Sequence, residues 1–138
     1  FSACKTEFKH LEYYYFHNCV YESVWKNNLR RTSERTSTLD LLHKYGADYK
    51  VVFVGDAAMA PYEITQPGGS VEHWNEEAGY VWMQRFMEKF KKLIWINPYP
   101  KDTWNYTSST NIVRELVEDR MYPLTLRGLE EGMRFLSK

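Results

Sequence analysis

The sequence predicts an α/β fold, a doubly wound and mostly parallel sheet with an antiparallel edge strand and helices on both faces. Two observations support this prediction. Short apolar runs alternate with helical patterns over most of the chain, and a hairpin-like pair of segments precedes them. Such alternation is typical of parallel strands that are joined by crossover helices. The 138 residues suffice for one domain with its own hydrophobic core.

The expected hairpin consists of two strand-like segments, residues 11–16 and 19–25, which are rich in Tyr, Val and Trp. Only His17 and Asn18 separate them, so we expect a two-residue turn. The polar residues 26–35 follow and are expected to form a solvated loop.

A short helix comes next. Leu39, Leu41 and Leu42 form its apolar pattern, which ends at Gly46. A hydroxyl side chain within residues 36–38 could cap its amino end.

Three strand–helix units complete the fold. Their strands are expected at residues 51–54, 93–96 and 121–124. A long irregular segment, residues 55–70, follows the first strand, and its helix is expected over residues 75–90 with Asn75 as the cap. The second helix contains four apolar residues at helical spacing, Ile112, Val113, Leu116 and Val117. The last helix begins at Thr125, and its expected apolar face consists of Leu126, Leu129, Met133 and Leu136.

Composition excludes several classes of partner. Eighteen basic and 18 acidic residues cancel, so no net field would attract nucleic acid or an anionic membrane. No apolar run approaches the roughly 20 residues of a membrane span, and no leader pattern is present. Two cysteines, Cys4 and Cys19, are too few for a disulfide framework. We therefore expect a cytoplasmic chain with reduced thiols and with neither a nucleic-acid nor a membrane partner.

Asp56 is the first candidate functional residue, because it follows the apolar strand 51–54 after a single glycine. Ligands of open α/β sheets bind in the crevice outside the carboxyl ends of the strands. A metal ion or a substrate is therefore expected at Asp56. The alternative interpretation is that this aspartate only turns the chain or caps the next segment.

Four segments together resemble the von Willebrand factor A-type domains of CoxE-like bacterial proteins. They are residues 13–18 (YYYFHN), 52–63 (VFVGDAAMAPYE), 73–77 (HWNEE) and 121–126 (MYPLTL). The resemblance covers nearly the whole chain. In such domains a central strand and a helix precede the hairpin, and residues 1–10 are too few to supply both. We therefore expect this fold to start upstream of Phe1, so that residues 1–138 are the C-terminal part of a single domain.

The resemblance also implies a divalent cation, Mg²⁺ or Mn²⁺, at the carboxyl end of the sheet. Of the three ligand loops of the family, Thr36 (or Thr38) would supply the threonine and Asp56 the aspartate. The sequence contains no Asp-x-Ser-x-Ser, which is the family's first loop. Thr36 and Asp56 alone would bind the ion weakly, because magnesium needs oxygen ligands that converge from separate loops.

The function that the resemblance implies is a non-catalytic protein-interaction domain that acts with a MoxR-type AAA+ ATPase in the maturation or remodelling of other proteins. Its docking surface would combine Thr36 and Asp56 with the loop of residues 61–74. Within that loop the expected partner-binding residues are Tyr62, Glu63, His73 and Trp74.

Two alternatives belong to other classes. One is a small metal-dependent hydrolase that uses Asp56, Glu63 and His73 at the sheet crevice. The other is a homodimer that covers an exposed edge of the sheet with a second copy of the chain.

Overall fold

The computed structural model describes residues 11–16, 23–26, 35–57, 63–65, 71–74, 79–106 and 108–137. Their centre is a parallel sheet in the order β3 (Lys50–Val54), β6 (Lys92–Asn97) and β7 (Met121–Pro123). Each of these strands lies within one or two residues of its expected position. The prediction of an α/β fold with a parallel sheet is confirmed.

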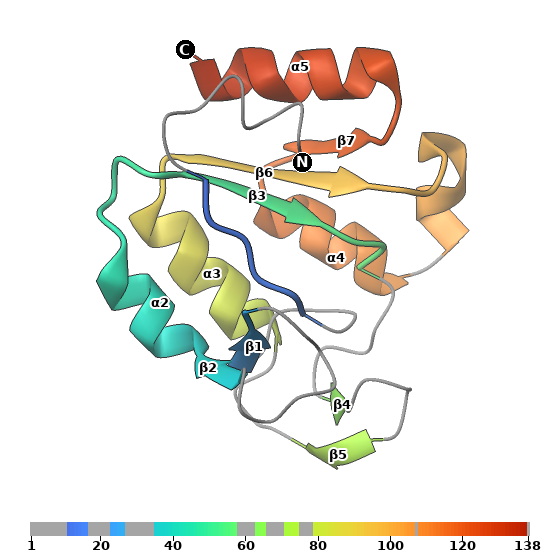
Figure 1. Cartoon of the computed structure of the whole chain (residues 1–138). Coiled ribbons are helices and arrows are strands. Elements are labelled where there is room, and N and C mark those ends of the chain that lie inside the picture. The colour runs from blue at the N-terminus through green and yellow to red at the C-terminus, as the bar shows by residue number, and fades with distance from the viewer. Residues whose placement is uncertain are drawn as a thin grey trace.

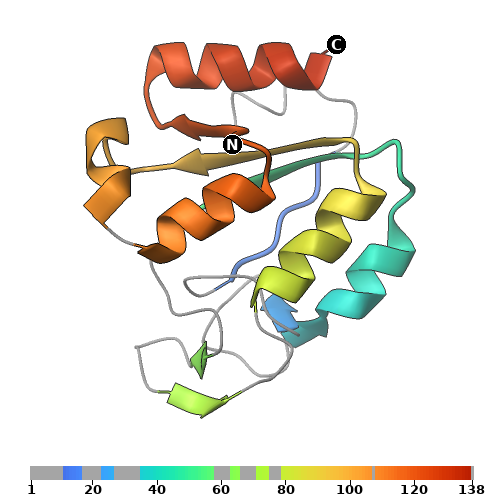
Figure 2. The ribbon, with the colours of Figure 1, turned by 180° about the vertical axis from the view of Figure 1, so that it is seen from behind.

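Helices cover both faces of this sheet (Figures 1 and 2). On one face lies α5 (Leu126–Ser137). On the other lie α2 (Thr38–Lys44), α3 (Gly79–Lys89) and α4 (Ser108–Leu116). A 3-10 helix, η2 (Lys101–Tyr106), lies between β6 and α4. The order of layers is therefore helix, sheet, helix.

Alternation along the strands divides the core between the two faces. Phe53 and Trp95 are buried in the larger cluster, together with residues of α3 and α4. Ile94 and Ile96 point the other way and pack with Leu136 of α5. This alternation explains why both faces of β6 are apolar, as expected of a central parallel strand.

The antiparallel strands form separate two-stranded sheets within the part of the chain that the structure describes. In the first, β1 (Ser23–Trp25) pairs with β2 (Arg35–Ser37), a strand that the sequence did not indicate. Tyr15 forms an isolated antiparallel bridge with Trp25. A two-residue turn at His17 and Asn18 would instead have placed Tyr15 opposite Val20, so the expected register was wrong; the turn itself lies outside the described residues.

The segment expected to be irregular contains the second antiparallel pair. Here β4 (Glu63–Thr65) pairs with β5 (Val71–Trp74), with a register irregularity between Ile64 and Thr65. The expected cap Asn75 lies outside the described residues.

The apolar face expected for α5 was partly wrong. Leu126 is 77% exposed and Leu129 is also exposed, whereas the buried residues are Gly128, Gly132 and Leu136. A Cβ atom at Gly128 would lie 2.1 Å from the Pro123 carbonyl oxygen, so α5 approaches the end of β7 through its glycines. Thr125 caps the helix, because its Oγ1 accepts a hydrogen bond from the Gly128 amide at 3.0 Å.

Among the described residues, no helix combines the length and the apolar character that crossing a membrane requires.

Candidate functional site

A cavity of about 380 Å³ opens at the carboxyl ends of β3 and β6. This is the position at which ligands of open α/β sheets bind. Among the described residues that line it, Asp56 is the only charged one. The lining residues are Phe16, Val54, Gly55, Asp56, Pro98 and Tyr99.

Hydrogen bonds of both backbone polar groups of Gly55 hold the turn that carries Asp56. The Gly55 amide donates a hydrogen bond to the Ile96 carbonyl at 3.0 Å. The Gly55 carbonyl accepts one from Trp95 Nε1 at 2.7 Å. Ala57 then adopts a φ of 55°, a left-handed conformation that an alanine adopts only when its surroundings enforce it.

Two buried polar side chains provide that enforcement. Asn97 at the end of β6 and Thr110 of α4 are 1% and 3% exposed. The Asp56 carbonyl accepts hydrogen bonds from Thr110 Oγ1 at 3.2 Å and from Asn97 Nδ2 at 3.4 Å. Asn97 Oδ1 also accepts one from the Tyr99 amide at 3.0 Å. The same asparagine therefore positions both sides of the cavity.

Replacing Thr110 with valine should lower the free energy of unfolding by about 1–2 kcal/mol, because the buried carbonyls of Asp56 and Ala57 would lose a donor. Urea unfolding followed by circular dichroism measures this change. Thr103→Val is the matched control, since the Thr103 hydroxyl bonds the Pro100 carbonyl at an exposed position where water can replace it. Equal losses in the two variants would show that Thr110 does not hold the turn.

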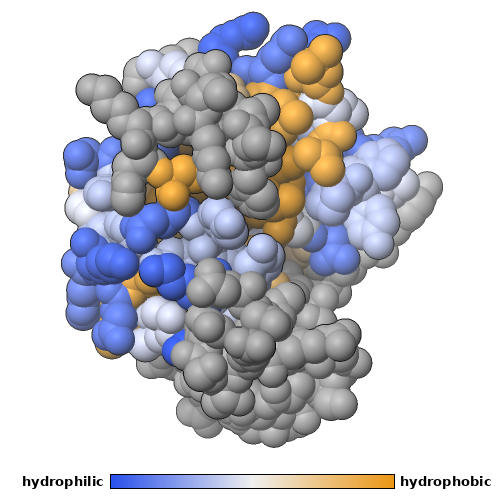
Figure 3. All heavy atoms as spheres, in the orientation of Figure 1, coloured by the Kyte–Doolittle hydropathy of each residue, from blue (hydrophilic) through white to orange (hydrophobic). Residues whose placement is uncertain are grey.

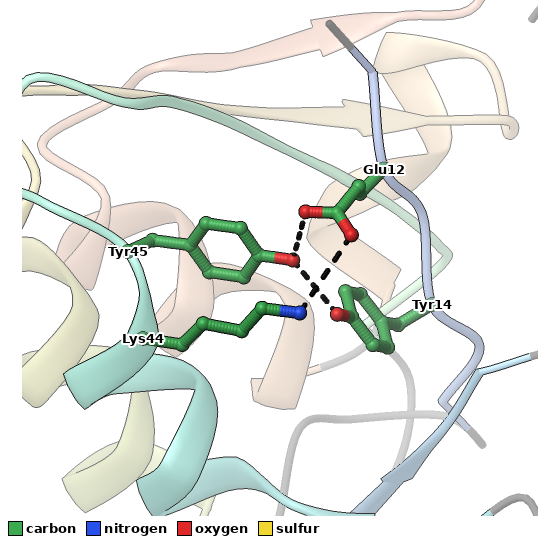
Figure 4. A network of polar contacts seen from close by, with 4 residues as sticks. All are labelled: Glu12, Tyr14, Lys44 and Tyr45. Carbon is green, nitrogen blue, oxygen red and sulfur yellow. Dashed lines mark hydrogen bonds and ion pairs between the residues drawn. The ribbon is translucent and has the colours of Figure 1, made fainter.

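The Phe16 wall of the cavity belongs to the segment of residues 11–16, which a polar network attaches to the end of α2 (Figure 4). Tyr45 donates a hydrogen bond from its hydroxyl to Glu12 Oε2 at 2.5 Å. Because that hydrogen is used, Tyr14 must be the donor in its contact of 2.8 Å with the Tyr45 hydroxyl. Lys44 Nζ lies 3.7 Å from Glu12 Oε1. The network thus fixes the segment that places Phe16 against Trp95, with ring centroids 5.9 Å apart.

Burial raises the pKa of Tyr45 above its ordinary value, and its hydrogen bonds to Glu12 and Tyr14 raise it further. The unfolded chain would release this proton near pH 10 whereas the folded chain keeps it. Stability from Tyr45 is therefore fully present below about pH 10 and should be lost as the pH rises above that value. Urea unfolding from pH 8 to 11 should show the wild-type protein losing stability faster than Tyr45→Phe. Parallel curves would contradict this assignment.

The structure separates the two expected metal ligands. Thr36 lies in β2, where it pairs with Val24, and it does not line the cavity. Figure 1 shows β2 at the start of α2, apart from the carboxyl end of β3 that Asp56 follows.

Three of the four expected partner-binding residues lie in the β4–β5 pair. Glu63 pairs with Trp74, and His73 pairs with Ile64. Tyr62 lies outside the described residues. The structure thus places Glu63, His73 and Trp74 on one antiparallel pair of strands.

The described residues of the cavity provide few ligands for a divalent cation. Within the described ranges no group of three or more His, Cys, Asp and Glu side chains is placed to hold a metal ion. Asp56 supplies the only carboxylate in the part of the lining that the structure describes, whereas Mg²⁺ and Mn²⁺ need several oxygen ligands. The described residues therefore do not fit the ion that the resemblance implies, and cation binding through Thr36 and Asp56 stays a prediction.

Sequence reasoning identified Asp56 but not the residues that position it. The Asn97-Pro98 pair after an apolar strand was the available signal for Asn97, since it marks a turn at the carboxyl end of β6. Thr110 is one of several hydroxyl residues around the start of α4 and carries no comparable signal.

Comparison of the chain with models of known protein families, with curated proteins and with solved structures finds no match.

Proposed function

We propose that this chain is a non-catalytic protein-interaction domain that docks a partner protein at the carboxyl end of its sheet. The observation that carries the proposal is the Asp56 cavity, which combines one carboxylate with apolar and aromatic walls. Tyr99 at its rim is 56% exposed. Exposed aromatic residues next to a shaped apolar cavity are typical of protein interfaces.

Apolar surface extends beyond the cavity and supports the same proposal. Val54 of β3 and three leucines around the start of α5 are exposed, Leu124, Leu126 and Leu129. Figure 3 shows apolar residues gathered on the side of the molecule where the strands end and α5 begins. A partner that covered the cavity would also remove part of this surface from water.

A catalytic role receives less support from the described residues. A hydrolase needs a base or a nucleophile beside Asp56. The described lining contains no His, Cys, Ser, Thr or Lys, and Glu63 and His73 lie on the β4–β5 pair. Docking therefore fits this cavity better than turnover.

The resemblance to von Willebrand A-type domains makes the proposal more specific. On that basis the chain would act in the cytoplasm beside a MoxR-type AAA+ ATPase, in the maturation or remodelling of other proteins. A Mg²⁺ or Mn²⁺ ion would assist docking only if ligands other than Asp56 complete its shell.

Photo-crosslinking from the cavity rim tests this function. A p-benzoylphenylalanine placed at Tyr99 in cells that make the protein should produce one discrete adduct. The same probe at Tyr49, which is exposed in the turn before β3, should not produce that adduct. No adduct at either site, or the same adducts at both, would refute docking at this end of the sheet.

The same samples distinguish the remaining possibilities. An adduct of twice the mass of the chain would identify a homodimer. An adduct that forms with Mg²⁺ and disappears with EDTA would show that a divalent cation assists docking.

A further inference from the structure

We propose that the face of β3 that carries Lys50, Val52 and Val54 binds an amphipathic helix of the partner protein. The helix would lie antiparallel to the strand, with its carboxyl end at Lys50. This inference rests on the proposed docking function and states the form of the contact. The helix would take on β3 the position that α5 takes on β6 and β7.

The register of the sheet shows where the side chains of this face point. Val52 is paired with Ile94 and Val54 with Ile96. Paired residues of neighbouring strands point to the same side of a sheet. Since Ile94 and Ile96 pack with Leu136 of α5, the two valines lie on the α5 side of the sheet. They are 42% and 43% exposed.

Exposed valines are unusual on a strand of a parallel sheet, because such strands are normally buried on both faces. The close contacts of α5 place it over the other two strands. Gly128 lies against Pro123 of β7. Gly132 lies against Ile94 of β6. A second helix next to α5 would remove the valines of β3 from water, and helices on both faces are the usual cover of such a sheet.

The strand sets the length of such a helix. The five residues of β3 span about 16 Å, which equals about 11 residues of α-helix. A helix of three turns with one apolar face would therefore cover the face from Lys50 to Val54.

Two lysines favour one direction for the helix. Lys50 and Lys92 are partners at the amino ends of β3 and β6, so both side chains lie on the α5 side. Lys92 Nζ donates a hydrogen bond to the Phe135 carbonyl in the last turn of α5 at 3.5 Å. A lysine is favourable there, because the carboxyl end of a helix carries partial negative charge. Lys50 can make the same contact with a helix over β3, and it would repel the positive amino end of a helix that ran the other way.

Charge also favours a partner protein over a second copy of this chain. Every α-helix that the structure describes has a basic residue in its last turn, so a helix from a second copy would bring a cation to Lys50. These residues are Lys44, Lys89, Arg114 and Arg134. A partner helix whose last turn is neutral or acidic avoids this repulsion.

The test is photo-crosslinking of the full chain from two positions of β3 in cells that make the protein, with the adducts mapped by mass spectrometry. A p-benzoylphenylalanine at Val52 and, separately, at Val54 should each capture the same partner segment. The two positions are about 7 Å apart along the strand, which equals about four to five residues of a helix. The residue captured from Val52 should therefore lie about one helical turn closer to the carboxyl end of the segment than the residue captured from Val54.

Reversing the charge of Lys50 tests the direction independently. Lys50→Glu should lower the adduct yield from Val52 about threefold or more, because a carboxylate would repel the carboxyl end of the helix. Lys26→Glu is the matched control, since it makes the same change at an exposed residue directly after β1. It should leave the yield within about twofold of the wild-type value. Circular dichroism checks that every variant keeps the fold.

Several results would overturn the inference. An offset of about two residues would indicate a strand, and an offset in the opposite direction would indicate a helix parallel to β3. Adducts only within the chain or with a second copy, no adduct from either valine, or an unchanged yield in Lys50→Glu would also overturn it. Each of these results leaves docking intact if the Tyr99 crosslink forms. Conversely, the expected offset without any Tyr99 adduct would support the helix contact and refute docking at the cavity.

Discussion

Replacing Gly128 with alanine should lower the free energy of unfolding by about 3 kcal/mol or more, at the upper end of the range for overpacked cores. The added Cβ would lie 2.1 Å from the Pro123 carbonyl oxygen and 3.0 Å from two further atoms of that proline. Pro123 is the last residue of β7 and paired with Asn97, so its backbone cannot move aside locally. The helix α5 would have to shift away from the sheet. Urea unfolding followed by circular dichroism measures the loss.

Gly46→Ala is the matched control for this prediction. Its Cβ would approach only Asp48 Oδ1, the end of an exposed side chain that can rotate away. We expect a change within about 1 kcal/mol, typical of a substitution outside the core. Gly132→Ala should lie between the two, because its nearest neighbour is the Ile94 Cδ1 methyl group at 2.9 Å. A Gly128 variant as stable as the Gly46 variant would show that α5 does not depend on close approach.

Replacing Trp95 with alanine should cost about 3–5 kcal/mol, the usual range for truncating a buried aromatic residue. Trp95 is 0% exposed in the centre of β6, and its ring stacks on Phe53 with centroids 5.2 Å apart. Its Nε1 also donates to the Gly55 carbonyl beside Asp56. The variant should therefore lose both stability and the shape of the cavity.

A pair of milder variants separates the two roles of the Trp95 side chain. Trp95→Phe keeps most of the apolar contact but leaves the Gly55 carbonyl without its donor, at a cost of about 1–3 kcal/mol. Trp82→Phe is the matched control, because the buried Nε1 of Trp82 has no hydrogen-bond partner among the described residues. This variant should lose less stability than Trp95→Phe. If both cost the same, the hydrogen bond to Gly55 does not stabilise the turn.

Local patterns predicted the parallel sheet well because its signals are short in range. The apolar runs of β3, β6 and β7 and the helical spacing between them could be recognised without knowing what they pack against. The antiparallel pairs were predicted poorly. The sequence 35–37 of β2 is polar, and its strand conformation depends on pairing with β1.

Of the residues that form the candidate site, the sequence predicted only one. Asp56 could be located because it follows a buried strand, and in parallel sheets that position faces the ligand crevice. Phe16 and Tyr99 could not be assigned to it, because they are distant in sequence and meet Asp56 only through tertiary packing. The resemblance predicted that Thr36 and Asp56 lie together. The structure places Thr36 in β2 of a two-stranded sheet, whereas Asp56 follows β3 of the parallel sheet.

The sequence by itself determined the fold class, the order of the parallel strands and of the helices that join them, and the position of a carboxylate at the end of β3. These depend on hydrophobic periodicity and turn chemistry, which act between near neighbours. Only the tertiary structure decided that Gly128 and Gly132 of α5 meet the sheet and that Leu126 and Leu129 are exposed. It alone decided that Asn97 and Thr110 hold the turn at Asp56. Both outcomes depend on steric fit and on the pairing of buried polar groups between distant segments, which no local pattern contains.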